Sequence, residues 1–237
     1  MFMPGFFFDW TYILVLPALA LVLWAQARVQ STFAEWGRRR TLRGLTGAQV
    51  AEAILADAGL TDVVVEPTPG HLTDHYDPRT RTLRLSESVY YSNSVSAIGV
   101  AAHEAGHAIQ HDMGYIPLTA RNFFVPLANL GSMGGPVLFM LGLFFPRSAL
   151  GGMLMDLGIL LFGLAVGFYL ITLPVEFNAS GRALAILEGH GYLQGEELRG
   201  ARAVLWAAAM TYVASAAMAV SQLLRLLFIR GMMRDDD

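Results

Sequence analysis

The chain has 237 residues, of which 54% are hydrophobic and only 15% charged, and its formal net charge is −3 at pH 7. This composition is too apolar for an ordinary soluble domain, and the slightly negative charge excludes a strongly basic nucleic-acid-binding protein. Because the chain has no cysteine, any metal site in it must use histidine and carboxylate ligands rather than thiolates.

Four apolar stretches are long enough to cross a bilayer, which takes roughly 20 residues. They cover residues 6–27, 123–145, 150–175 and 203–229. No basic residue precedes the first stretch and Asp9 lies near its start, so we interpret it as a retained anchor and not as a cleavable signal peptide. The sequence therefore predicts a mainly α-helical membrane protein with about four transmembrane helices and the lipid bilayer as a partner.

The predicted spans divide the chain into five segments. They are an N-terminal transmembrane anchor (1–28), a cytoplasmic region (29–122), a transmembrane hairpin (123–175), a second cytoplasmic segment (176–202), and a C-terminal transmembrane helix with an acidic tail (203–237). Arginines follow the first span and occupy the 176–202 segment, which places both on the cytoplasmic side by the positive-inside rule. Arg230 and Arg234 near the C-terminus run against this rule.

The cytoplasmic region begins with local signals for a helix and a small sheet. Thr46 and Gln49 form a capping-box pattern ahead of an apolar helical stripe. Residues 63–65 are a strand candidate, 75–78 indicate a turn, and 80–85 alternate as a half-exposed strand. That last strand could hold an extended peptide along an open edge or form an ordinary hairpin, and the sequence does not decide between the two.

The run His103-Glu104-Ala105-Gly106-His107 carries the strongest chemical signal. Residues four apart on a helix are offset by about 40° and about 6 Å, so both imidazoles project from one face and can hold a single Zn²⁺. Glu104 lies one step round the helix, where a carboxylate can take a proton from an activated water. The alternative is a buried helix with two hydrogen-bonded histidines, but it leaves the charged Glu104 unexplained.

His111 follows on nearly the same helix face. It lies a full turn beyond His107 and cannot readily close a tetrahedron around an ion shared by the first two histidines. We therefore expect His111 to support the site from outside the ligand set or to face solvent.

Glu176 is the best-placed third ligand among the downstream carboxylates. Two predicted spans separate it from His107, so the chain returns to the same membrane face just before it. Asp156 lies within the third span and fails this test, whereas Glu188 and Glu196 pass it but lie further from the membrane edge. The alternative for Glu176 is an acid in the first turn of a helix, stabilised by the helix dipole.

Asp156 and Arg225 are the clearest ionisable residues within predicted spans. Counted at about 1.5 Å per residue, both lie within about 10 Å of the outer boundary. Since ionisable groups in lipid usually face protein and find partners, we expect an interhelical pair, with separate snorkelling to the interface as the alternative.

Several segments resemble the YugP-type neutral zinc metallopeptidases. They are AAHEAGHAIQ (101–110), DHYDP (74–78), LSE (85–87) and LPVEFNAS (173–180), and the likeness extends over nearly the whole chain. That family is similar, more distantly, to the membrane gluzincins such as the HtpX heat-shock proteases and the CAAX prenyl proteases.

The resemblance implies a zincin-like α+β catalytic region and a multi-pass protein of the bacterial inner membrane. The arginine distribution places its active site on the cytoplasmic side. The resemblance also implies one Zn²⁺ per chain held by His103, His107 and Glu176, with Glu104 as the catalytic acid/base. Ser180 stands where the distant relatives have Asp, and a hydroxyl orients an imidazole less strongly than a carboxylate does.

These observations predict a zinc metalloendopeptidase that hydrolyses a peptide or protein substrate, membrane proteins among them. His75, Tyr76 and Arg182 are the candidates for stabilising the oxyanion that develops during hydrolysis. The alternative is a non-catalytic zinc-binding membrane scaffold, against which the intact Glu104 argues.

Overall fold

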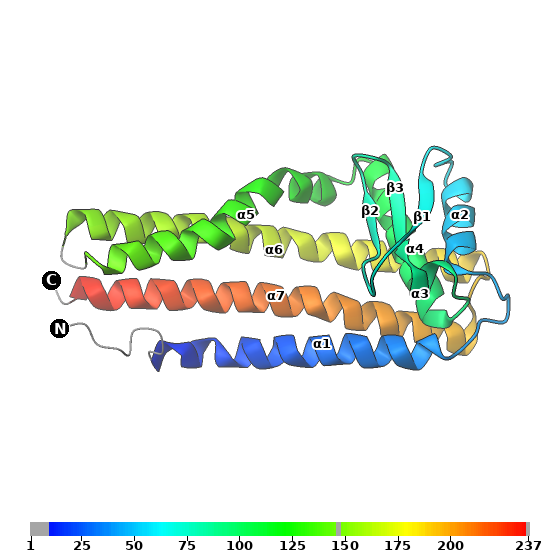
Figure 1. Cartoon of the computed structure of the whole chain (residues 1–237), viewed down its shortest axis with the longest axis horizontal. Helices are drawn as coiled ribbons and strands as arrows, with labels where there is room; N and C mark the ends of the chain where they lie inside the picture. The colour runs from blue at the N-terminus through cyan, green and yellow to red at the C-terminus, as the bar shows by residue number, and fades with distance from the viewer. Residues whose placement is uncertain (1–9, 146–147, 236–237) are drawn as a thin grey trace. The chain divides into compact units, whose positions relative to one another are not determined.

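The computed structural model describes residues 10–145 and 148–235, with side chains described as far as residue 233. Its elements, drawn in Figure 1, are η1 (Trp10–Leu14), α1 (Leu16–Gly37), α2 (Gly47–Asp57), β1 (Val64–Thr68), β2 (His75–Asp77), β3 (Thr82–Ser86), α3 (Glu87–Tyr90), α4 (Val95–Asp112), α5 (Ile116–Leu143), α6 (Ala149–Gly189) and α7 (Gly195–Asp235). The prediction of a mainly helical protein is confirmed, and the small sheet is mixed.

The chain divides into two compact units that interleave along the sequence. One contains residues 1–24, 120–173 and 212–237, and the other contains residues 25–119 and 174–211. The three longest helices each contribute to both units, because α5, α6 and α7 all run across these boundaries.

The first unit contains the most apolar part of the chain. Within it, Phe139 of α5, Met155 and Phe162 of α6, and Leu226 of α7 form a buried apolar cluster. The backbones of α5 and α6 approach closely: a Cβ added at Gly131 would lie 2.2 Å from the Leu161 carbonyl oxygen. Such small-residue contacts are the usual way in which helices pack in a membrane, where no hydrophobic force drives them together.

Three helices of the described residues are long and apolar enough to cross a membrane: Ile116–Leu143, Ala149–Gly189 and Gly195–Met233. They contain the third and fourth predicted spans and all of the second except its last two residues, 144 and 145. The first predicted span, 6–27, begins in residues 6–9, which lie outside the described part of the chain. A fourth span therefore stays a prediction.

Two helices extend beyond the predicted spans within them. Residues 150–175 are part of α6, which continues through Pro174 to Gly189. Proline removes one backbone hydrogen bond but does not end a helix whose neighbouring turns remain intact. Glu176 accordingly lies within a long helix and not in the first turn of a new one. The last helix likewise begins at Gly195, before the predicted 203.

The predicted pair between Asp156 and Arg225 stays a prediction, and each of the two residues has another described contact. Asp156 accepts hydrogen bonds from Arg230, at 2.7 Å from Nε and 3.2 Å from Nη2. Arg225 is buried, donates to Thr11 Oγ1 at 2.8 Å and lies over the Tyr12 ring. Helix α7 extends to Asp235 and not to 229, so Arg230 also lies on it and contacts Asp156 near the start of α6.

The second unit is built around α4. Thr46 and Gln49 form the predicted capping box, with Gln49 N donating to Thr46 Oγ1 and Thr46 N donating to Gln49 Oε1. Helix α2 then buries Val50, Ile54 and Leu55 in a core that includes Ile98 of α4. Both α2 and the sheet pack against α4.

The sheet has the strand order β1-β3-β2, with β3 parallel to β1 and antiparallel to β2. The prediction of a turn at 75–78 is wrong, since His75–Asp77 form the strand β2. Strand β3 is central and not an open edge, because it pairs on both sides, and its Leu83 and Leu85 are fully buried. Strand β2, whose described pairing is only with β3, is the edge next to α4 (Figure 1).

Candidate metal centre

Helix α4 presents the two histidines because its N-terminus is capped and its other faces consist of small residues. The Ser94 side chain accepts a hydrogen bond from Ala97 N and ends the preceding loop. Alanines and glycines then cover the packed faces of α4, so neighbouring elements approach its backbone closely. A Cβ added at Gly106 would lie 2.9 Å from the Ala179 carbonyl oxygen of α6. This close approach brings α6 side chains within reach of the imidazoles.

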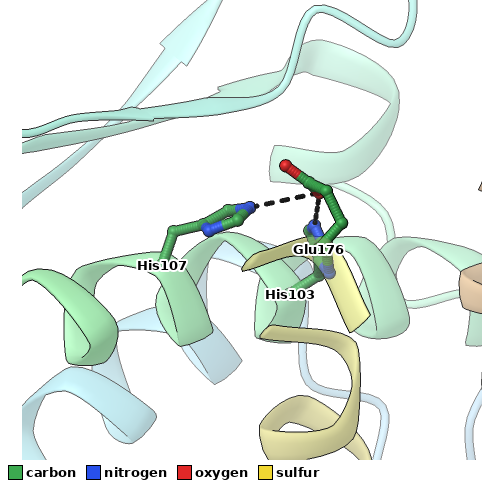
Figure 2. Close-up of side chains that lie close together, drawn as sticks. All are labelled: His103, His107 and Glu176. Atoms are coloured by element: carbon green, nitrogen blue, oxygen red, sulfur yellow. Dashed lines mark ion pairs between the residues drawn. The ribbon is translucent and has the colours of Figure 1, made fainter. Parts of the chain in front are cut away.

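His103, His107 and Glu176 meet at one point (Figure 2). Glu176 Oε2 lies 3.3 Å from His103 Nε2 and 3.5 Å from His107 Nε2. The three candidate ligand atoms all lie within 4.8 Å of one another, and among the described residues this is the group that could hold a metal ion. His107 and Glu176 are buried and His103 is largely so.

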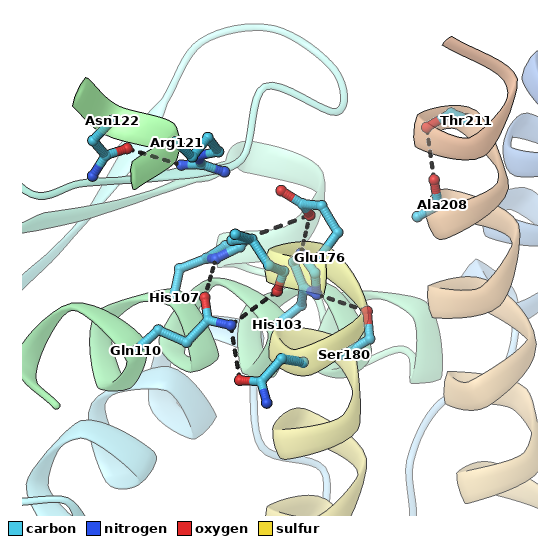
Figure 3. A network of polar contacts seen from close by, with 11 residues as sticks. His103, His107, Gln110, Arg121, Asn122, Glu176, Ser180, Ala208 and Thr211 are labelled. Carbon is cyan, nitrogen blue, oxygen red and sulfur yellow. Dashed lines mark hydrogen bonds and ion pairs between the residues drawn. The ribbon is translucent and has the colours of Figure 1, made fainter. Parts of the chain in front are cut away.

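The other ring nitrogens of both histidines are also held (Figure 3). His103 Nδ1 lies 3.1 Å from Ser180 Oγ on α6, and His107 Nδ1 lies 3.0 Å from Gln110 Oε1 on α4. The sequence pointed to Ser180 but missed Gln110. The available signal was a glutamine one turn after His107 in an otherwise apolar helix.

Glu104 is buried beside the three candidate ligands, and its side chain takes part in none of the hydrogen bonds that the structure describes. Burial raises its pKa to about 7 from the ordinary 4.5; the nearby His103 opposes this increase, and Glu176 adds to it. A carboxyl group with a pKa near neutrality is suited to accept and return a proton at physiological pH.

Asp74, next to the predicted 75–78 segment, contributes to the same electrostatic environment. Its carboxylate accepts hydrogen bonds from Ser86 N at 2.7 Å and Ser86 Oγ at 3.0 Å. Burial nevertheless raises the Asp74 pKa, because these hydrogen bonds only partly offset the loss of solvation. The Asp74 charge in turn helps to raise the pKa of Glu104.

The three oxyanion candidates lie in different places. His75 is exposed on β2, its Nδ1 is 2.8 Å from Thr73 O, and its charge acts to lower the Glu104 pKa. The Tyr76 hydroxyl contacts His111 Nδ1 at 3.0 Å, so His111 supports the strand and is not a member of the ligand group.

Arg182, the third candidate, is held through its Nε and Nη1 atoms. Its Nε donates to Asn178 Oδ1 at 2.7 Å and its Nη1 lies 3.2 Å from Met113 Sδ. The rejected third ligands are also accounted for. Glu188 is exposed, and Glu196 is exposed and forms an ion pair with Arg39.

The donor set fits zinc. Two imidazole nitrogens and one carboxylate are the ligands of several catalytic zinc sites, which leave a further position open. Each ring is turned so that Nε2 points to the shared centre while Nδ1 has a hydrogen-bond partner. This arrangement is what a metal-ligating histidine requires, because the outer hydrogen bond sets the ring orientation.

Comparisons with known proteins point to zinc as well. Residues 11–231 match the family described as "Putative neutral zinc metallopeptidase". The "Putative membrane protease YugP" of Bacillus subtilis (strain 168) is 48% identical to this chain over 227 residues, which cover 94% of this chain and 98% of that protein. No solved structure shows a significant match.

Proposed function

The chain belongs to the neutral zinc metallopeptidase family, and on that premise we propose that it is a membrane-embedded zinc endopeptidase that hydrolyses peptide bonds. The observation that carries this proposal is the meeting of His103, His107 and Glu176 beside a buried Glu104. The three ligands are the residues that would hold one Zn²⁺ per chain.

When bound in such a site, zinc supplies Lewis acidity toward a carbonyl oxygen and toward water. The chain itself supplies the proton transfer. Glu104, with a pKa of about 7, accepts a proton from the attacking water and delivers it to the leaving amine. Ser180 and Gln110 keep both imidazoles oriented throughout, since each contacts an outer ring nitrogen.

Strand β2 is the element we propose for substrate binding. It is an edge of the sheet and packs against α4, so an extended peptide could pair with its outer side. Of the three oxyanion candidates, His75 is favoured, because it is exposed on β2 and acts electrostatically on Glu104. Tyr76 and Arg182 already have partners in His111 and Asn178.

We also propose the membrane placement that the arginine distribution indicates. The catalytic region would be zincin-like and face the cytoplasm of a bacterial cell, with four spans in the inner membrane. The additional span would be the first predicted stretch, residues 6–27, which includes the beginning of α1. A reporter fused after residue 45 and another fused at the C-terminus would test the two sides independently.

The experiment for activity compares the wild-type chain with Glu104→Gln, both purified in detergent. We expect casein hydrolysis by the wild type that is lost on chelation and restored by zinc. Glu104→Gln should keep about one zinc per chain and lose turnover by several orders of magnitude, because an amide cannot accept the proton of water. Glu188→Gln, an exposed substitution on α6, is the matched control and should remain active.

Two results would contradict the proposal. Residual activity in Glu104→Gln, in a preparation free of other proteases, would remove Glu104 from the mechanism. Full zinc occupancy without hydrolysis of any casein or membrane-protein substrate by the wild type would favour a zinc-binding scaffold.

A further inference from the structure

Gln110 lies at the centre of a hydrogen-bond chain that the metal centre does not by itself require. It is fully buried, one turn after His107 on α4. Its Oε1 lies 3.0 Å from His107 Nδ1, and its Nε2 lies 2.9 Å from both the Val175 carbonyl oxygen and Asn178 Oδ1. All these contacts are within normal hydrogen-bond distance.

The main-chain carbonyl of Val175 determines which way the Gln110 amide is turned. A carbonyl oxygen can only accept a hydrogen bond, so the amide nitrogen must face it. Asn178 agrees with this orientation, because its Oδ1 also accepts from Arg182 Nε at 2.7 Å. The Gln110 oxygen is therefore the atom that faces His107.

This orientation determines where His107 carries a hydrogen. Since Gln110 Oε1 can only accept, His107 Nδ1 must donate, whatever the state of the other ring nitrogen. The ring is thereby held with Nε2 toward Glu176. His103 differs, because its partner Ser180 Oγ can either donate or accept and so does not select one form of the ring.

We propose that Gln110 is a positioning residue that commits His107 to its metal-ligating form before any metal arrives. The backbone of α6, acting through Val175, thus presets the hydrogen position on one of the two imidazoles, while Ser180 leaves both forms of the His103 ring open. The assignment of the metal ligand rests on the proposed function, but the hydrogen position on His107 does not.

The first test uses the metal-free wild-type chain labelled with ¹⁵N-histidine, which contains six histidines. Long-range ¹H–¹⁵N spectra should show a hydrogen on His107 Nδ1 that exchanges slowly with solvent. A spectrum of His107 with a bare Nδ1 would overturn the proposal. This measurement needs no variant, so it holds even where a substitution prevents folding.

The second test compares Gln110→Met with Gln26→Met, an exposed substitution on α1. Methionine matches the length of glutamine but offers His107 no amide oxygen. We expect zinc affinity, measured by competition with a chelator, to fall by about 10- to 100-fold in Gln110→Met, as for other partners of metal-ligating histidines. The Nδ1 hydrogen of His107 should then exchange rapidly, and Gln26→Met should match the wild type in both measurements.

A purely structural role for Gln110 would lower the melting temperature of the metal-free chain and leave zinc affinity unchanged, which would overturn the proposal. Neither test measures hydrolysis. A chain that binds zinc with the expected dependence on Gln110 but cleaves no substrate would refute the proposed function and leave this inference intact.

Discussion

Burial of Glu104 should make the metal-free protein less stable as the pH rises, and Glu104→Gln should remove that dependence. The Glu104 pKa is raised from 4.5 to about 7 in the folded chain, chiefly by burial. A pKa difference of one is worth about 1.4 kcal/mol, so ionising this carboxyl costs about 3 kcal/mol more in the folded than in the unfolded state.

The direction follows from the order in which the two states lose the proton. Below pH 4.5 the carboxyl is protonated in both the folded and the unfolded chain, and the stability that its raised pKa contributes is fully present. Between pH 4.5 and about 7 the unfolded chain loses the proton first, so the contribution falls, and above about 7 it is lost. Glutamine has no proton to lose, so the variant should gain stability over the wild type as the pH rises.

Thermal unfolding of the chelated protein in detergent, followed at pH 5, 6, 7 and 8, measures this difference. Other titrating groups are common to both chains and largely cancel. The advantage of Glu104→Gln should grow by about 2–3 kcal/mol from pH 5 to pH 8, or about 5–10 °C in melting temperature for a chain of this size. Glu52→Gln, an exposed change on α2, should show a flat difference. A constant offset for Glu104→Gln across this range would refute the reasoning.

Three further predictions concern the packing around the site and the pairing in the first unit. Glu176→Ala should weaken zinc binding by more than about 100-fold, which exceeds the loss expected for a residue that only hydrogen-bonds a metal-ligating histidine. Glu188→Ala should bind zinc normally. Unchanged zinc affinity in Glu176→Ala would exclude Glu176 as a ligand. Gly106→Ala should push α4 away from α6, because the new Cβ would lie 2.9 Å from Ala179 O; the free energy of unfolding should fall by about 1–3 kcal/mol and zinc binding should weaken. Gly99→Ala is the control, because its new Cβ would have its nearest contact at 3.4 Å. Equal losses in the two variants would contradict the argument. In double-mutant cycles of thermal stability, Asp156→Asn and Arg230→Gln should couple by about 0.2–1 kcal/mol; a stronger coupling of Asp156 with Arg225 would restore the original pairing.

Local patterns in the sequence were sufficient for the features that depend on a few neighbouring residues. The spacing of His103 and His107 determines that they share a helix face, because helix geometry is the same in any fold. The capping box at Thr46 and Gln49 was predicted for the same reason and is confirmed by its two hydrogen bonds. Apolar length predicted about four spans, and three helices of the described residues are long and apolar enough to cross a membrane.

Features that depend on segments distant in sequence were predicted poorly or not at all. Residues 75–78 were predicted to form a turn, yet 75–77 form a strand, because they pair with β3. The contact of Asp156 with Arg230 was not predicted, because helix ends are set by packing and not by the last apolar residue, and α7 continues to Asp235.

The candidate metal centre combines both kinds of information. Sequence by itself determined the HExxH pair and, through the counting of membrane crossings, narrowed the third ligand to a few carboxylates that included Glu176. Only the tertiary structure decided that Glu176 meets both imidazoles, while Glu188 and Glu196 are exposed. It also revealed the contacts of Gln110, whose partner Val175 lies 65 residues away. The physical reason is that a helix face follows from local geometry, whereas a ligand contributed by another helix depends on how closely two backbones can approach, here at Gly106 and Ala179.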